Sequence, residues 1–446
     1  MNRRKAREGA LGCKVNRRKA REGALGCKVN RRKAREGALG CKVNRLTAIH
    51  LAISAIQGTI LYNRRMELKI LTSIAAVDAD QWNALAGTAN PFLRYEFLSA
   101  LERNACVGER HGWLPRHVLA YDDSGRLTGA VPMYLKDNSY GEFVFDWSWA
   151  DAYQRAGLPY YPKSVVAVPY TPSTGPRILT ARSDESDDVA NQLIRLTREW
   201  SKSEQLSSLH YLFTDKTDTD RLKEQGFLLR LGCQFHWQNQ GYRDFDDYLS
   251  CFSSRKRKKV RRERRHVQQA DIEIRAVLGQ QASDPEIEVM YDFYRSTFEK
   301  KWGHPTLTLD FFREIAATMG EQLLFFIASK QRRIVAGAIC FRSDDTLYGR
   351  HWGCYDDYHS LHFETCYYQG IDYCIRHGLK VFEPGAQGEH KISRGFLPTP
   401  TWSAHWIRNR EFRDIIARFL DQETGAMRDY MDELSGHSPF KQGQAA

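Results

Sequence analysis

The sequence predicts an α/β protein in which mixed sheets are flanked by helices. Two observations support this prediction: a strand-rich segment occurs twice, and the stretches around both copies repeat apolar residues with helical spacing. The composition agrees with it, because 446 residues with 42% hydrophobic and 27% charged side chains can bury at least one large core in a soluble chain.

The duplication relates residues 118–141 to residues 326–349 at a constant offset of 208, with six identities in 24 positions. Each copy is expected to form a strand, a polar turn, a strand through a Gly-Ala pair, an Asp-rich turn, and then an aromatic strand at Tyr140 or Tyr348. We therefore expect two copies of one α/β unit, at residues 66–241 and 242–446. The tripeptide Asn239-Gln240-Gly241 marks the division between them.

Helices are expected where apolar side chains recur three and four residues apart. The stretches with this spacing are residues 92–103, 187–204, 286–298, 310–319 and 362–377. A strand is expected at residues 227–237, and a further helix is expected to begin near Asp244.

Residues 1–65 are expected to lie outside this fold. Three identical copies of 14 residues, at 2–15, 16–29 and 30–43, each carry five basic residues and one acid, so they account for the whole formal charge of +12. Each copy offers too little apolar surface to offset the entropy of ordering it, which predicts a disordered segment. A mis-assigned start codon would explain the repeats; a basic arm that binds nucleic acid or a membrane is the alternative.

The sequence favours a cytoplasmic protein without stable membrane insertion. The apolar residues 46–61 include His50 and Gln57, are too short to span a bilayer, and begin too late for ordinary secretion. No later run approaches about 18 apolar residues. The seven cysteines outside the repeats form no Cys-x-x-Cys pair, which suits reduced thiols.

The densest polar motif is a Gly-rich loop at residues 382–396, which follows a short strand at residues 380–382. Its glycines allow backbone amides to face a ligand. Glu389 and His390 are candidate general bases or relays, whereas Lys391 and Arg394 offer positive charge to phosphates or a carboxylate. Gln387 is a further candidate for substrate binding. The alternative interpretation is a solvated turn with ordinary charges.

A second candidate cluster lies on the aromatic strand at residues 347–353 and on the helix that follows it. Its candidate substrate-binding residues are Arg350, Trp352, Glu364 and Tyr367. Tyr348 or Tyr367 is suited to protonate a leaving group. The alternative is an aromatic core strand with a paired arginine.

Nine basic residues and one acid lie between Arg255 and Arg265. On a helix they point in every direction, so we expect this segment to bury no face and to be solvated or in contact with phosphates of RNA or of a nucleotide-linked precursor. No P-loop, nucleophile elbow or Gly-x-Gly-x-x-Gly motif is present. His359, His362 and Glu364 lack zinc-site spacing, so no metal is expected.

Several strings together resemble the FemAB-like proteins of the GNAT acyltransferase superfamily, over residues 90–440. The strings of the first half are Asn90-Pro91-Phe92, Gly112-Trp113-Leu114-Pro115, residues 139–147, Tyr160-Tyr161-Pro162-Lys163, Pro169-Tyr170-Thr171-Pro172 and Gly175-Pro176-Arg177. Those of the second half are Leu347-Tyr348-Gly349-Arg350, residues 361–364, residues 366–370 and the loop at 385–396. The resemblance implies two tandem GNAT-like domains.

The resemblance also implies N-acyl transfer, in which an aminoacyl group passes from a charged tRNA to an amine of a cell-wall precursor or a related small-molecule acceptor. Glu389 or His390 would then take the proton of the amine, and Tyr348 would stabilise the oxyanion. The passage at residues 353–360 holds two acids and lacks the glycines that cradle a pyrophosphate, which disfavours an acyl-CoA donor. An acetyl-CoA-dependent N-acetyltransferase and a non-catalytic binder of glycan or nucleotide-linked precursors are the alternatives.

Overall fold

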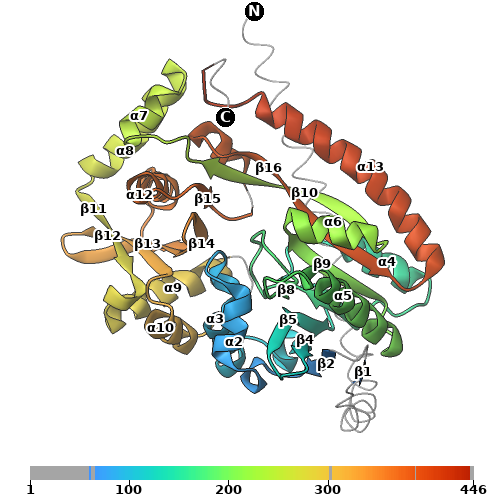
Figure 1. Ribbon diagram of the computed structural model, residues 1–446. Coiled ribbons are helices and arrows are strands. Elements are labelled where there is room, and N and C mark those ends of the chain that lie inside the picture. Colours follow the sequence, from blue (N-terminus) through green and yellow to red (C-terminus); the bar gives the residue numbers. More distant parts are fainter. Residues whose placement is uncertain (1–59, 62–65, 301–303, 387, 442–446) are drawn as a thin grey trace, which may run out of the picture. The chain divides into compact units, whose positions relative to one another are not determined.

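The computed structural model describes residues 60–61, 66–300, 304–386 and 388–441 of the chain (Figure 1). All of them belong to one of two units of the chain, Thr59–Ala446. The described residues form two sheets with flanking helices, so the predicted α/β class is confirmed.

The smaller sheet has the strand order β1-β2-β4-β5-β8. Its strands are β1 (Ile60–Leu61), β2 (Met66–Leu71), β4 (His117–Asp122), β5 (Leu127–Val131) and β8 (Leu179–Thr180). Two residues of the segment expected outside the fold, Ile60 and Leu61, therefore pair with β2, opposite Leu68 and Glu67. The repeats, by contrast, lie outside the described residues.

The larger sheet has the order β11-β12-β13-β14-β15-β10-β16-β9-β7-β6-β3. Its strands are β3 (Trp113–Pro115), β6 (Met133–Lys136), β7 (Lys163–Val166), β9 (Ser208–Thr214), β10 (Leu228–Gln238), β11 (Ile272–Leu278), β12 (Leu323–Lys330), β13 (Arg333–Arg342), β14 (Thr346–Cys354), β15 (Val381–Glu383) and β16 (Leu397–Ile407).

The five helices predicted from periodicity form close to the expected bounds. They are α3 (Tyr95–Arg103), α5 (Ser186–Ser203), α9 (Asp284–Lys300), α10 (Leu309–Thr318), and a continuous helical run of α11 (Leu361–Phe363), the π-helical turn η5 (Glu364–Tyr368) and α12 (Gln369–His377). The other helices are α2 (Ala79–Ala86), α4 (Trp147–Arg155), α6 (Lys216–Glu224), α7 (Phe245–Ser250), α8 (Ser254–Gln269) and α13 (Arg410–Ser435). Asp244 caps α7 by accepting a hydrogen bond from the amide of Asp247.

The duplicated segments form two equivalent hairpins, β4–β5 and β12–β13. Each hairpin has a register shift at the same place, between Ala120 and Tyr121 and, 208 residues later, between Ala328 and Ser329. The shared glycines have the same role in both. A Cβ atom on Gly129 would lie 2.7 Å from side chains of α5, and one on Gly337 would lie 2.4 Å from a side chain of α9. Both glycines therefore let a helix pack closely on its hairpin.

The predicted aromatic strand forms in the second copy only, as β14. In the first copy the corresponding residues 137–146 form a loop between β6 and α4, so this part of the prediction is wrong. The physical reason is a buried ammonium group: Glu142 and Asp146 of the loop both pair with Lys163 on β7. These ion pairs fold the loop back onto the sheet.

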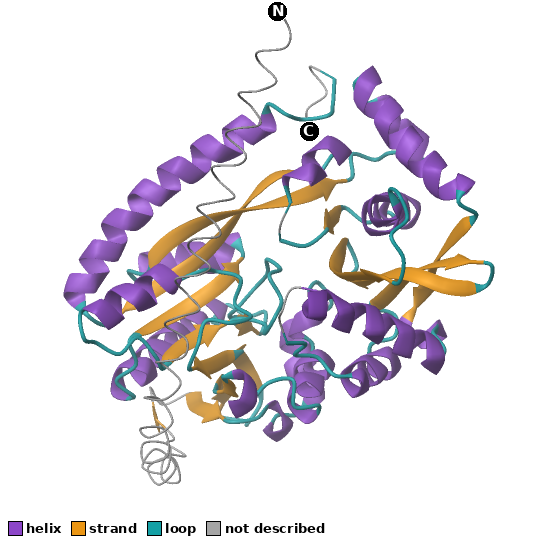
Figure 2. Cartoon of the chain, turned by 180° about the vertical axis from the view of Figure 1, so that it is seen from behind, coloured by secondary structure: helices purple, strands orange, loops and turns teal. Residues whose placement is uncertain are grey.

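The larger sheet continues through both halves of the chain. The late strand β16 pairs with β10 on one side and with β9 on the other, and β10 also pairs with β15. The strand pairing does not divide the chain at residue 241, so the domain boundary expected there from the duplication stays a prediction. The long helix α13 runs along β10 and β16 in both views (Figures 1 and 2), and Arg230 of β10 forms an ion pair with its Glu423. Among the residues that the structure describes, no helix has the length and apolar character needed to cross a bilayer.

Candidate functional site

A pocket opens where β14 and β15 part. The two strands are parallel and pair only from Thr346 with Val381 to Tyr348 with Glu383. After Glu383 the strand pairing ends, although Pro384 still lies close to Gly349, and β14 continues and bulges against β13 at Arg350. The resulting β14–β15 pocket has a volume of about 420 Å³, within the range of pockets that bind small ligands.

Four of the predicted site residues line the β14–β15 pocket: Arg350, Trp352, Tyr367 and Lys391. They come from β14, from the π-helical turn η5 and from η6 (Glu389–Arg394), a short 3₁₀ helix within the predicted loop. The loop residues Gly385 and Ala386 complete this side of the pocket. The structure thus brings together residues that lie about 40 positions apart in the sequence.

Lys391 places an ammonium group in this pocket. Its side chain is buried, and its Nζ atom donates a hydrogen bond of 2.6 Å to the carbonyl oxygen of Gly385. Among the described residues no carboxylate forms an ion pair with it. Burial lowers the pKa of Lys391 to about 8. This ammonium group therefore retains donors for a ligand and titrates close to neutral pH.

Glu383 is the last residue of β15 and directly precedes Pro384, which lines the pocket, whereas Glu383 itself does not line it. Burial raises the pKa of its carboxyl group to about 8, although the guanidinium groups of Arg350 and Arg177 oppose this shift. A carboxyl group with this pKa is suited to general-base catalysis. Glu383 was not among the residues predicted from the sequence. The available signal was its position at the end of a short strand, directly before a Pro-Gly turn.

Arg350 and Arg177 are held by backbone carbonyl groups. Arg350 donates to the carbonyl oxygen of Tyr170, and Arg177 donates to those of Leu212 and Ser173. Tyr170 has a φ of 59°, an unusual value for a bulky side chain. The two guanidinium groups are thus fixed before any ligand arrives.

The structure does not bring the predicted base Glu389 into the pocket. Its exposed carboxylate accepts a hydrogen bond of 2.8 Å from the hydroxyl group of Tyr430 on α13. His390 approaches the pocket only through Tyr367, whose hydroxyl group lies 2.9 Å from its Nε2 atom. Burial, together with the nearby charges of Arg394 and Lys391, lowers the pKa of His390, so its ring is a neutral partner for Tyr367.

Tyr348 lies in the hydrophobic core rather than in the pocket. Its ring packs 5.1 Å from that of Phe92, and its hydroxyl group points toward the carbonyl oxygen of Ala89 at 3.4 Å. Burial raises the pKa of this hydroxyl group. The structure therefore supports the alternative interpretation for Tyr348, an aromatic core residue. Gln387 lies outside the described residues.

Two predicted binding residues, Arg394 and Glu364, connect the pocket to the basic helix α8. The buried guanidinium of Arg394 donates to Glu263 at 2.9 Å, to the hydroxyl group of Tyr368 and to the carbonyl oxygen of His390. Glu364 accepts a hydrogen bond of 3.2 Å from Arg264. Both side chains therefore position the loop and the π-helical turn.

The expectation that the basic helix buries no face is wrong. Val260, Glu263 and Val267 of α8 are buried, because they recur at spacings of three and four and form one stripe. The remaining sides of α8 stay cationic. Its exposed basic residues are Arg255, Lys258, Arg261, Arg262 and Arg265.

A second pocket, of about 250 Å³, lies on the other side of the Gly-rich loop. Its walls come from residues 143–145, β10, β16 and α13, and Ala386 lines this pocket as well as the β14–β15 pocket. Ala386 of the Gly-rich loop is thus shared by two cavities. We call residues 138–147 the aromatic loop, which includes Trp147 at the start of α4, and the second cavity the aromatic-loop pocket.

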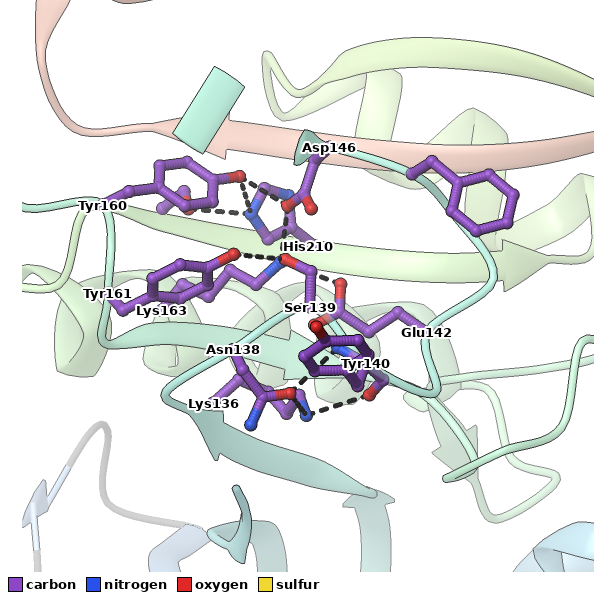
Figure 3. Close-up of polar contacts among 12 residues, drawn as sticks. Lys136, Asn138, Ser139, Tyr140, Glu142, Asp146, Tyr160, Tyr161, Lys163 and His210 are labelled. Carbon is purple, nitrogen blue, oxygen red and sulfur yellow. Dashed lines mark hydrogen bonds and ion pairs between the residues drawn. The ribbon is translucent and has the colours of Figure 1, made fainter. Parts of the chain in front are cut away.

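The aromatic loop is held by a buried polar cluster around Lys163 (Figure 3). The Nζ atom of Lys163 donates to Glu142 at 2.8 Å, to Asp146, and to the hydroxyl group of Ser139 at 2.9 Å. Burial raises the pKa of Glu142 to about 7 against the opposing effect of Lys163. For Asp146, burial is the largest single influence and acts to raise the pKa, but the charge of Lys163 and the hydrogen bonds from Lys163 and Ser139 together contribute to lowering it to about 2. No local pattern in the sequence indicates this cluster.

Comparison with known proteins identifies the family of this chain. Residues 73–442 match the family model FemAB-like, described as peptidoglycan biosynthesis/recognition. No curated protein matches the sequence. Among solved structures, a C-terminal domain of a putative lysylphosphatidylglycerol synthetase from Agrobacterium fabrum is similar at 9% identity and a TM-score of 0.47, over 80% of this chain and 98% of that chain.

Two further solved structures are similar over comparable lengths. FemX has 12% identity and a TM-score of 0.48, over 76% of this chain and 98% of its own. A tandem GNAT protein from the clavulanic acid biosynthesis pathway has 12% identity and a TM-score of 0.39, over 77% of this chain and 99% of its own. Since the family model spans most of the sequence, the chain belongs to the FemAB-like family of peptidoglycan biosynthesis/recognition proteins.

Proposed function

We propose that this protein is an N-acyltransferase that moves an aminoacyl group from an ester donor, such as charged tRNA, to an amine of a cell-wall precursor. The observation that carries the proposal is the β14–β15 pocket, which is lined by the buried ammonium of Lys391 and by Arg350, whose charge in turn acts on the carboxyl group of Glu383. Family membership supports the substrate class.

The reaction needs a base and a group that stabilises negative charge. The amine acceptor must lose a proton as its nitrogen attacks the ester carbonyl, and ionised Glu383 is suited to take that proton. Negative charge then develops on the carbonyl oxygen, where the ammonium of Lys391 can donate a hydrogen bond. As the new C–N bond forms, the C–O bond of the ester breaks, and the proton passes to the leaving oxygen.

The pair of Tyr367 and His390 offers a second route for protons. The hydroxyl group of Tyr367 lines the pocket, and its hydrogen bond to His390 leads to the exposed surface. In this arrangement His390 acts through Tyr367, as the relay predicted from the sequence. Arg350 and Trp352, on the opposite wall, are placed to contact the acyl group.

An ester donor fits this site better than acyl-CoA. Asp356 and Asp357 are exposed in the segment directly before α11, where a pyrophosphate would otherwise meet the positive end of the helical run. Two carboxylates there repel such an anion. The exposed cations of α8 suit the phosphates of a tRNA instead.

Single-turnover assays of the full chain with aminoacyl-tRNA and a nucleotide-linked cell-wall precursor would test the proposal. We expect transfer, and a loss of about a hundredfold or more for Glu383→Gln and for Lys391→Met although both variants remain folded. Glu389→Gln, on the α13 side of the loop, is the matched control and should keep its activity.

Three outcomes would contradict this proposal. Thiol release from acetyl-CoA, with no use of the ester, would assign the acetyl-CoA-dependent alternative. Folded Glu383→Gln and Lys391→Met variants with full turnover would remove the β14–β15 pocket as the site. Ligand-dependent stabilisation without any transfer would indicate a non-catalytic binder.

A further inference from the structure

The aromatic loop presents four large aromatic side chains to solvent. The exposed fractions are 68% for Tyr140, 40% for Phe143, 56% for Phe145 and 42% for Trp147. Folding normally buries such side chains, so a group of this size on one short loop indicates a binding surface.

The conformation of the aromatic loop keeps these aromatic side chains in solvent. Its polar residues Ser139, Glu142 and Asp146 face inward and are only 5%, 3% and 2% exposed, and Lys163 of β7, which they contact, is 0% exposed. Phe143 has a φ of 60°, in the left-handed region that bulky residues avoid. Local strain of this kind persists where the surrounding structure imposes it, and it is concentrated at functional sites. The buried ion pairs of Lys163 supply that constraint.

Phe143 and Phe145 form one wall of the aromatic-loop pocket, and the rest of its lining combines apolar side chains, among them Leu231 and Trp402, with a polar patch. The polar patch contains Thr401 and Ser403 of β16 and the ion pair of Arg230 with Glu423, whose two hydrogen bonds each measure 2.8 Å. Arg230 also donates to the carbonyl oxygen of Phe145, which joins this patch to the aromatic wall. The pocket therefore combines flat apolar rings with hydroxyl groups and an internally neutralised charge pair.

We propose that the aromatic-loop pocket binds one sugar ring of the amine acceptor. The apolar C–H face of a pyranose packs on an aromatic ring, whose face is electron-rich. The hydroxyl and acetamido groups of the sugar then bind Thr401, Ser403 and the Arg230–Glu423 pair. The proposal rests on the proposed function in one respect, that the acceptor carries a sugar.

Size and charge favour a single sugar ring over other ligands. A volume of 250 Å³ equals roughly eight waters of liquid, which suits one ring and excludes a whole nucleotide. A lipid chain would offer no hydrogen-bonding group to the hydroxyl group of Thr401 or to the outer edge of the Arg230–Glu423 pair. An anionic phosphate would find Arg230 already paired with Glu423. Because Ala386 lines both pockets, a ring bound here places its substituents toward the β14–β15 pocket.

Titration calorimetry and saturation-transfer NMR on the full chain would test this inference, with N-acetylglucosamine and N-acetylmuramic acid as probes and the peptide L-Ala-D-Glu-L-Lys as the probe without sugar. We expect binding of the sugars, with saturation strongest at the ring C–H protons. Phe145→Ala and Thr401→Val should each weaken binding about tenfold or more. Phe419→Ala removes a 41% exposed aromatic side chain on α13 and should change nothing.

The outcomes separate this inference from the proposed function. Glu383→Gln should bind the sugars as well as the natural chain does, because Glu383 does not line the aromatic-loop pocket. The inference would be overturned if Phe145→Ala and Thr401→Val left sugar binding intact, or if the sugar-free peptide bound equally well. Both results would leave transfer activity as it is. Absence of transfer with normal sugar binding would instead contradict only the proposed function.

Discussion

The guanidinium group of Arg394 and the carboxylate of Glu263 form a buried ion pair that joins the Gly-rich loop to the basic helix α8. Nη2 of Arg394 lies 2.9 Å from Oε1 and 3.0 Å from Oε2 of Glu263, and the side chains are 2% and 7% exposed. The two residues are 131 positions apart in the sequence. The pair fixes the loop that separates the two pockets.

Removing one partner of this pair should destabilise the fold rather than weaken substrate binding alone. Glu263→Leu leaves the guanidinium of Arg394 buried without its counter-ion, which should cost about 3–5 kcal/mol in the free energy of unfolding. The double variant Glu263→Leu/Arg394→Met should recover much of that loss, as measured by urea denaturation. Lys259→Gln, whose partly exposed amine lies 3.9 Å from Glu263, is the control and should change stability little. A double variant as unstable as the sum of its single variants would contradict this prediction.

Activity should depend on pH through Glu383 and Lys391. Glu383 must be ionised and Lys391 protonated, and burial holds both pKa values at about 8. We therefore expect kcat/KM to rise as Glu383 ionises toward pH 8 and to fall above it as Lys391 loses its proton. Lys391→Arg keeps its charge at higher pH, so the falling limb should move upward. A profile that Lys391→Arg leaves unchanged would assign this limb to another group.

Stability provides an independent test for Glu383. Its pKa is raised from 4.5 to about 8, so between these values the folded chain binds more protons than the unfolded chain does. Folding is therefore favoured by this group at low pH, and the contribution is lost as pH rises to about 8. Relative to Glu383→Gln, the natural chain should lose stability across this window. A constant difference in unfolding free energy would show that the carboxyl group is not buried in this way.

Lys163 should contribute strongly to stability. In Lys163→Met the carboxylates of Glu142 and Asp146 lose the ammonium group that both contact, at a cost of about 3–5 kcal/mol near neutral pH. The deficit should shrink toward pH 4, because the two carboxyl groups can then be neutral in the fold. Urea denaturation at both pH values measures it, with Lys216→Met as the exposed control. A deficit that stays the same at both pH values would argue against buried charge as its cause.

The basic helix should bind nucleic acid by charge alone. Replacing the exposed Arg255, Lys258 and Arg262 by Gln should weaken tRNA binding and flatten its salt dependence, by about 0.7–0.9 in slope for each phosphate that is no longer neutralised. Filter binding over a range of salt concentrations measures both effects. The matched control removes three exposed charges of α13, Arg410, Arg418 and Arg428. Equal losses in both triple variants would indicate an unspecific effect of net charge.

Local sequence patterns were sufficient to predict many elements of this fold. Helices α5, α9 and α10 follow from apolar spacing, and the two hairpins follow from the duplication, because both signals are local and periodic. The polar Gly-rich loop was also recognisable, since composition alone marks such segments. Among its residues, Lys391 proved to line the β14–β15 pocket.

Long-range packing, in contrast, determines which polar groups lie buried, paired or open to a pocket. Glu389 and Glu383 are six residues apart, yet one faces α13 and solvent whereas the other is enclosed beside Arg350 and Arg177. Burial and ion pairing depend on side chains that arrive from distant parts of the chain, as Lys163 does for the aromatic loop. Local patterns do not encode those neighbours, and the cost of removing a charge from water depends on them entirely.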